Sequence, residues 1–474
     1  MKKKTLRLPA YAAGLAALLV AAAPGACSNT PNPEEVYAQP RANGGSPSGG
    51  SSRGGAAGEG AARNEPGSGG ELTTAGAAGE ANEGGAAGQD GGEEPVVVEC
   101  GSAPVSDESF SKAALRRAAA ACADWQYCRF ENAATVLASR VAEHADTRSE
   151  TSLSRARDAY REAMELWSMV ELFQFGPLAS AAESAGKDIY QGQGMRELIY
   201  SWRLVARCRV EEQVASQAFA SGGMDGVLIS GRGLYALEYL LFYPGTDSEC
   251  LAATPTGQAW PGFDAEELEA RKLGYAVAVA DDVLQRTQTL RTTWAPSGGN
   301  FRETFVSASD PSKYPSEQEA MNALGWALIY IEKEVKDWKL GMRIGTIPGD
   351  HVPEVPFAAA TAGFEALPTE NIRRNLRGFR ALFQGCGDGG EGLGFDDWLS
   401  EAGHGELATD IVAAWQGAQS AADAFPPLET ASTAELDALY QSLRTLTNLL
   451  KTEMFGAGSP LGLKLPTSVG SDTD

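Results

Sequence analysis

The chain has 474 residues, of which 43% are hydrophobic and 21% are charged, so it can bury a folded core. The 62 acidic residues outnumber the 39 basic ones, which gives a formal net charge of −23. Contacts to phosphates require clustered positive charge, so we expect no nucleic-acid partner. Of the 55 glycines, 18 lie between residues 41 and 95, but they are not distributed as in collagen.

The first 26 residues have the features of an export signal. Four basic residues within positions 2–7 precede an apolar run, Leu8–Ala23, that is shorter than the ~20 residues of a transmembrane helix. Small residues then lead to Cys27, as in the lipobox of bacterial lipoproteins, although Pro24 stands where that pattern prefers Leu. We expect cleavage before Cys27 and its lipidation. Ordinary signal-peptidase cleavage near Ala23 or Ala26 is the alternative.

Residues 27–99 are predicted to form a flexible Gly/Ala/Ser/Glu tether. Between residues 41 and 95 there is no aromatic residue, and Leu72 is the only large aliphatic one. Such a segment cannot bury enough apolar surface to offset the entropy lost on ordering. A lipid anchor followed by a long flexible tether predicts a cell-envelope protein held at a membrane. Because Ser28, not Asp, follows Cys27, we expect the outer membrane.

Cysteine usage suits an oxidising compartment. If Cys27 carries lipid, six cysteines remain: Cys100, Cys122, Cys128, Cys208, Cys250 and Cys386. Six cysteines allow 15 connectivities, so the sequence predicts at least one disulfide without giving the pairing. No two cysteines have the spacing of a zinc site, and the chain has only 3 His.

From about residue 107 onward, apolar residues recur every three or four positions, which indicates helices. Met321–Trp338 and Leu436–Leu450 show this spacing over long stretches. Gly and Pro interrupt it between Thr293 and Tyr314. We therefore predict an all-α fold of two helical bundles, over residues 100–300 and 301–474.

One helix, Gly233–Phe242, resembles the signature helix of the imelysin-like family of bacterial envelope proteins. The family motif reads Gly-x-His-x-x-Glu, followed by an aromatic residue and two leucines. Further segments carry the resemblance, which covers roughly residues 107–474: Tyr160–Phe175, Ile199–Trp202, Asn371–Gly378, Leu461–Leu465 and Ser471–Asp474. It implies two four-helix-bundle-like lobes and a link to iron regulation or uptake. Some members of the family are described as metallopeptidases.

Gly233 and Glu238 match the motif, but Tyr235 stands where the family has His. A His and a Glu three positions apart share a helix face and can hold a metal ion or activate water. Tyr, with a pKa near 10, is a poor replacement for imidazole toward divalent ions, although a hydroxyl and a carboxylate could bind a ferric ion. The alternative is that Tyr235 and Glu238 are interior residues that satisfy one another or a nearby Arg.

We therefore expect Gly233, Tyr235 and Glu238 to line a ligand site, with Glu238 as the candidate ligand for iron or another divalent or trivalent metal. The resemblance implies a binding module, with a metal or another envelope protein as partner, and we assign no catalytic residue. Two other functions stay open. One is a metallopeptidase-like hydrolase, and the other is a structural or partner-binding protein with a degenerate site.

Overall fold

The structure, a computed structural model, describes residues 94–179, 194–202, 206–308, 310–346, 356–456 and 458–466, all within the unit Arg41–Asp474. The predicted signal peptide, Cys27, the tether up to residue 93 and Ser471–Asp474 lie outside the described residues.

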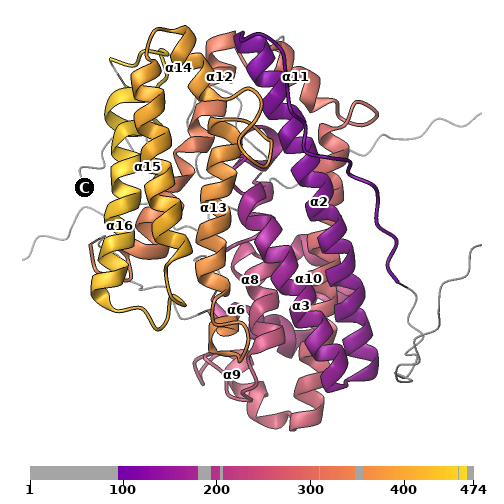
Figure 1. Ribbon diagram of the computed structural model, residues 1–474. Helices are drawn as coiled ribbons and strands as arrows, with labels where there is room; N and C mark the ends of the chain where they lie inside the picture. Colours follow the sequence, from indigo (N-terminus) through magenta and orange to yellow (C-terminus); the bar gives the residue numbers. More distant parts are fainter. Residues whose placement is uncertain are drawn as a thin grey trace, which may run out of the picture. The chain divides into compact units, whose positions relative to one another are not determined.

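Helices joined by loops make up the described part of the chain, which contains no β-strand (Figure 1). The prediction of an all-α fold is confirmed. The helices are α2 (Lys112–Thr147), α3 (Glu150–Val170), η1 (Gly176–Leu178), α5 (Met195–Ile199), α6 (Arg207–Ser216), α7 (Phe219–Gly222), η2 (Met224–Gly226), η3 (Ile229–Gly231), α8 (Gly233–Phe242), α9 (Pro255–Ala259), η4 (Trp260–Gly262), α10 (Ala265–Trp294), α11 (Phe301–Ser307), α12 (Glu317–Leu328), η5 (Ile331–Gly341), η6 (Phe357–Ala360), α13 (Leu367–Phe383), α14 (Phe395–Glu401), α15 (Gly405–Asp423), α16 (Thr433–Asn448) and η7 (Leu449–Met454). None of them is both long and apolar enough to cross a membrane.

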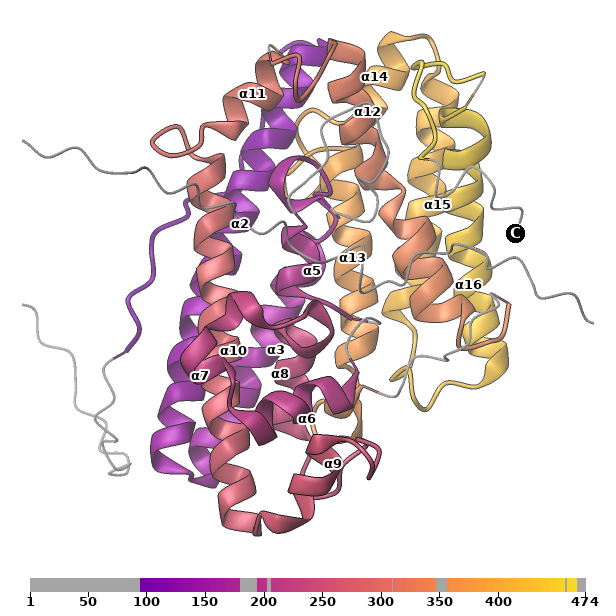
Figure 2. The ribbon, with the colours of Figure 1, turned by 180° about the vertical axis from the view of Figure 1, so that it is seen from behind.

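Helices α2, α3, α8 and α10 pack against one another in the first half of the described chain (Figure 2). The hairpin between α2 and α3 follows from local chemistry. Arg148 adopts a left-handed conformation and ends α2, and Ser149 with Ser152 then forms a capping box that starts α3. The Asp264 side chain caps α10 in the same way, by accepting from the Glu267 N–H.

Helix α13 connects this group to the later helices, since it contacts α3 on one side and α15 on the other (Figure 1). Gly378 permits the close approach to α3. A Cβ atom at this position would lie 2.9 Å from the carbonyl oxygen of Met169, so a larger residue would push the two helices apart. Helix α15 in turn packs against α14 and α16, and α16 contacts η5.

Two stretches predicted as ordinary α-helix end in π-helical segments. The Met321–Trp338 pattern runs from α12 into η5, where the Met342 N–H donates to the Asp337 carbonyl, five residues back, at 2.8 Å. The Leu436–Leu450 pattern likewise runs from α16 into η7. One turn of a π-helix contains more residues than one turn of an α-helix. The spacing of apolar residues therefore does not predict which side chains of η5 are buried.

All six described cysteines form disulfides, Cys100–Cys128, Cys122–Cys386 and Cys208–Cys250, which confirms the expectation of at least one. Cys122–Cys386 ties α2 to the loop that follows α13, 264 residues later. It therefore crosses the boundary predicted at residue 300, and the division into two bundles there stays a prediction.

Changing both Cys122 and Cys386 to Ala should lower the free energy of unfolding more than the same change at Cys100 and Cys128. The entropy removed from the unfolded chain grows with loop length, and the separations of 264 and 28 residues correspond to about 5.5 and about 3.5 kcal/mol. Denaturant unfolding of the two double variants measures the difference. Equal losses, or a larger loss at Cys100–Cys128, would contradict this ranking.

Candidate functional site

A cavity of about 40 Å³ lies where most of the segments that resemble the imelysin-like family meet. It is lined by Tyr160, Met164, Tyr200, Trp202, Glu238, Lys339, Arg343, Pro356, Ala358, Leu367, Pro368, Asn371 and Leu428. Most of the wall is apolar, and the polar groups come from α3, α8, α13, the π-helical region and the loop after α5. A space of this volume has room for a small ion or a few water molecules.

Glu238 brings a carboxylate into this cavity, and its role in binding a ligand stays a prediction. Its side chain is buried, with 4% of the residue exposed. One carboxylate oxygen accepts from the Ala358 N–H at 2.8 Å, and the other accepts from the Tyr160 hydroxyl at 3.2 Å. Both donors are neutral, and no ion pair to Glu238 occurs in the described chain. Burial therefore raises the pKa of Glu238 to about 7, and the two hydrogen bonds offset only part of this effect.

Gly233 positions α8 and does not itself line the cavity. Its φ of +78° is costly for any residue with a side chain, and a Cβ here would lie 2.8 Å from the Ile199 carbonyl oxygen. The Ser201 hydroxyl also donates to the Arg232 carbonyl at 2.7 Å. These two contacts hold the Ile199–Trp202 segment against the start of α8, which places Tyr200 and Glu238 at one cavity.

Arg232, the residue before α8, anchors the helix from the other side. Its guanidinium pairs with the Asp282 carboxylate of α10 at 2.5 Å, and both side chains are 1% exposed. Tyr275, also on α10, donates to the Gly231 carbonyl at 2.7 Å. The beginning of α8 is thus fixed by contacts to α10 and to the residue-200 segment.

Tyr235 lies one turn before Glu238 on α8 and is buried. It does not line the cavity, but it lies close enough to Tyr160 and Tyr200 to contribute to the raised pKa of both phenols. The structure therefore brings Tyr235, Tyr160, Tyr200 and Glu238 into one neighbourhood. The role of Gly233 and Tyr235 in binding a ligand stays a prediction.

Tyr160 and Tyr200 are site residues that sequence reasoning did not single out, although both fall in segments that carry the family resemblance. Burial is the largest cause that raises the pKa of each hydroxyl, and the Glu238 carboxylate adds to it. The Tyr200 side chain lines the cavity, and the buried Oδ1 of Asn371 in the same wall has no hydrogen-bond partner within the described residues. The cavity wall thus holds polar groups that a ligand could satisfy.

A buried polar network compensates the basic residues on the cavity wall. The fully buried Glu171 carboxylate accepts from the Lys339 ammonium at 3.0 Å, the Asn375 amide at 2.7 Å and the Tyr330 hydroxyl at 2.5 Å. Burial alone would raise the pKa of Glu171, but Lys339 and Arg196 hold it below the ordinary value. The sequence does not reveal this network, because charged residues that alternate with apolar ones in a predicted helix normally lie on its solvent-exposed side.

The raised pKa of Glu238 links stability to pH. Between pH 4.5 and about 7 the folded chain keeps a proton on Glu238 that the unfolded chain has lost. This contribution to stability is complete below pH 4.5 and disappears as the pH rises through 7. Relative to a Glu238→Gln variant, the wild type should therefore lose on the order of 3 kcal/mol of unfolding free energy between pH 4.5 and 8.

Urea unfolding of both proteins at intervals across this range gives the difference directly. An exposed carboxylate on α10, changed as Glu266→Gln, provides the background. If the pH profiles of the wild type and Glu238→Gln were parallel, Glu238 would not be buried in the protonated form.

Comparison with known proteins agrees with the fold. A family model described as Imelysin matches residues 125–450. Two solved structures are similar: a putative iron-regulated protein A precursor from Parabacteroides distasonis ATCC 8503 and an imelysin-like protein from Psychrobacter arcticum 273-4. Each has a TM-score of 0.51 and 17% sequence identity, and the match covers 73% of this chain and 95% of the other. At that identity they support the fold alone, and no curated protein matches the chain. Because the family match spans more than half of the sequence, the chain belongs to the imelysin family.

Proposed function

We propose that the protein is a binding module of the cell envelope whose cavity takes up a ferric ion. The observation that carries this proposal is the Glu238 carboxylate, which is buried with two neutral hydrogen-bond donors and without an ion pair in the described chain. A buried carboxylate in such surroundings is stable only when it is protonated or when a cation joins it. A bound cation would neutralise the negative charge of the Glu238 carboxylate.

The donors around Glu238 favour a hard, highly charged ion. Tyr160 and Tyr200, which carry phenol oxygens, line the cavity together with Glu238, and the Tyr160 hydroxyl donates to the Glu238 carboxylate. Because the pKa of both phenols is raised, a weakly charged ion would not remove their protons. A trivalent ion brings enough local charge to reverse this preference, and oxygen donors suit it. No cluster of three His, Cys, Asp or Glu side chains that could hold a metal occurs in the described part of the chain, so the tyrosines are needed.

The basic residues on the wall do not oppose this assignment, because each is already neutralised. Lys339 pairs with Glu171, and Arg343 pairs with Glu429 at 2.9 Å. The cavity volume of about 40 Å³ also restricts the size of the ligand. The cavity accepts an ion with few water molecules but not a haem group or a peptide.

The residues at the site favour metal binding over hydrolysis, although the matched family model is named as a peptidase family. The similar structure from Parabacteroides distasonis carries the description iron-regulated protein A precursor. A metallopeptidase would need a site that activates water, and here the motif position of the family His is Tyr235. No His lines the cavity within the described residues. We therefore infer binding as the function of this site.

Adding ferric nitrilotriacetate to the purified protein should give one ferric ion per chain and a visible phenolate-to-iron charge-transfer band. Glu238→Gln and Tyr200→Phe should each weaken binding by roughly 100-fold, because each removes a ligand atom. Tyr127→Phe is the matched control. Tyr127 is fully buried, and its hydroxyl has no hydrogen-bond partner among the described residues. It lies on α2 and does not line the cavity, so its loss should leave the band unchanged. Tyr235→His should add affinity for zinc if the remaining ligands are in place.

Binding without a charge-transfer band would exclude the tyrosines as ligands. The absence of any ferric binding would overturn the proposal. Hydrolysis of a peptide by Tyr235→His with zinc, together with no ferric binding by the wild type, would favour a peptidase ancestor with a degenerate site.

Anchoring at the envelope belongs to the same proposal. The sequence of residues 1–27 and the disulfides Cys100–Cys128, Cys122–Cys386 and Cys208–Cys250 support export to an oxidising compartment. We expect an acylated Cys27 at the mature N-terminus, in the outer membrane. Cys27→Ala should move the protein from the membrane fraction to a soluble fraction, and mass spectrometry of the N-terminal peptide checks the lipid. An unmodified N-terminus at another residue would contradict this assignment.

A further inference from the structure

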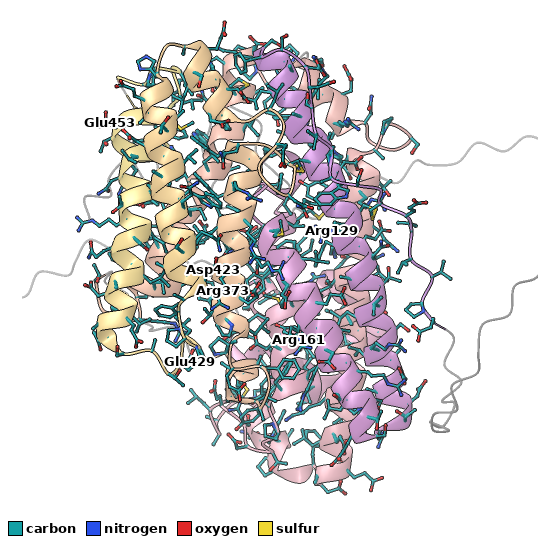
Figure 3. All side chains as sticks on the ribbon, viewed as in Figure 1. Arg129, Arg161, Arg373, Asp423, Glu429 and Glu453 are labelled. Atoms are coloured by element: carbon teal, nitrogen blue, oxygen red, sulfur yellow. A yellow bond between two sulfur atoms is a disulfide. The ribbon has the colours of Figure 1, made fainter. Side chains whose placement is uncertain are left out.

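A second and larger hollow lies between α2, α13 and α15, separate from the cavity that contains Glu238. Its volume is about 400 Å³, and four arginines line it: Arg129, Arg374, Arg377 and Arg380. Figure 3 labels two of its lining residues, Arg129 on α2 and Asp423 at the end of α15, on the viewed face. We call this hollow the arginine groove. In a chain with a net charge of −23, so many arginines at one place require an explanation.

Internal carboxylates neutralise only part of the arginine groove. Arg374 pairs with Glu165 at 2.6 Å and with Glu370 at 2.7 Å, and Arg377 lies 3.9 Å from the same Glu370. Arg129 and Arg380 have no carboxylate within ion-pair distance in the described chain. Two positive charges are therefore left without a direct counter-ion.

These two arginines are nevertheless held in place. The Arg129 guanidinium lies 4.6 Å from the ring centre of Trp125, and that of Arg380 lies 5.3 Å from the ring centre of Trp415. Stacking uses the flat face of a guanidinium and leaves its N–H edge for oxygen acceptors. Arg380 also donates to the Asp388 carbonyl, in the loop that the Cys122–Cys386 disulfide ties to α2. Each guanidinium is thus held by contacts to its neighbours within the fold.

An amide in the wall adds an independent indication of a ligand. Gln126 lines the arginine groove with 1% of the residue exposed. Its Oε1 accepts from Arg129 at 3.5 Å, whereas its buried Nε2 has no acceptor within the described residues. A buried donor without an acceptor costs free energy, and an oxygen-rich ligand would remove that cost.

The lowered pKa values of Arg129 and Arg380 also favour an anionic ligand. Burial lowers the pKa of Arg129, and the like charge of Arg374 lowers it further, although Asp388 and Glu162 act in the opposite direction. Burial also lowers the pKa of Arg380. Crowded guanidiniums of this kind are stabilised by a bound anion.

We propose that the arginine groove binds a small polyanion, a molecule that carries two or more carboxylate or phosphate groups. Arg129 of α2 and Arg380 of α13 provide the charged donors, and Gln126 provides a neutral one. The volume leaves room for more than a single phosphate ion. Asp388 and Asp423 also line the groove, so a ligand must fit between these carboxylates, which favours a compact molecule.

Calorimetric titration of the metal-free protein with citrate and with pyrophosphate tests the proposal. We expect one of the two to bind with one molecule per chain, and which of them binds identifies the polycarboxylate or the polyphosphate class. Arg129→Gln and Arg380→Gln should each weaken binding by about tenfold, because each removes a charged donor. Affinity should also fall as the salt concentration rises.

Arg161→Gln is the matched control. Arg161 lies on α3 on the same viewed face (Figure 3), pairs with Asp158 at 2.7 Å and does not line the groove. This change removes the same charge and should alter affinity by less than about twofold. Far-UV circular dichroism verifies that the variants fold, and Glu238→Gln should bind the polyanion as the wild type does. The proposal is overturned if neither anion binds at millimolar concentration, or if Arg161→Gln weakens binding as much as Arg129→Gln.

Discussion

Glu171 lies at the end of α3 with no exposed surface, and the way its charge is compensated links helices from distant parts of the sequence. Lys339 of η5 and Asn375 of α13 bind its carboxylate directly, and Tyr330 links it to Arg196 of α5. Removing one partner of a buried ion pair typically costs about 3–5 kcal/mol, because the remaining charge is left uncompensated. The packing of α3, α5, η5 and α13 around Glu171 is therefore constrained by charge as well as by apolar contact.

The same constraint explains why the neighbouring carboxylate can remain without an ion pair. Lys339 and Arg343 face the cavity but are committed to Glu171 and Glu429, so neither neutralises Glu238. Two buried carboxylates near one another thus have opposite pKa shifts. Compensation lowers the pKa of Glu171, and burial raises that of Glu238 to about 7. Contrasted environments of this kind are typical of functional sites.

The helical fold could be predicted because amphipathic spacing is a local property of the sequence. Glu238 could be predicted because it lies in a recognisable motif on one helix. Its partners could not, since Tyr160 and the Ala358 N–H are 78 and 120 residues away from it, and only the packed structure brings them together. The buried charges of η5 were missed because a π-helical segment does not follow the α-helical period.

The Asn371–Gly378 segment of α13 shows how much one short sequence can determine. Asn371 lines the cavity, Asn375 binds Glu171, and Gly378 lets the helix approach Met169. In the sequence this segment carries the family resemblance, but each role depends on which neighbour the residue meets. Helix propensity and the spacing of apolar residues predict the helix, but only tertiary contacts show the different role of each residue along it.

Helix α13 also contributes residues to both the cavity that contains Glu238 and the arginine groove. Asn371 faces the cavity that contains Glu238, whereas Arg374 and Arg377 face the arginine groove. At physiological ionic strength charges more than about 8 Å apart are largely screened, so the net charge of −23 does not cancel the local field of the groove. A long polyanion would extend beyond that distance and meet the acidic surface, whereas a compact one would interact only with the arginines. If the groove binds an anion as proposed, screening would therefore favour a small anion over a long one.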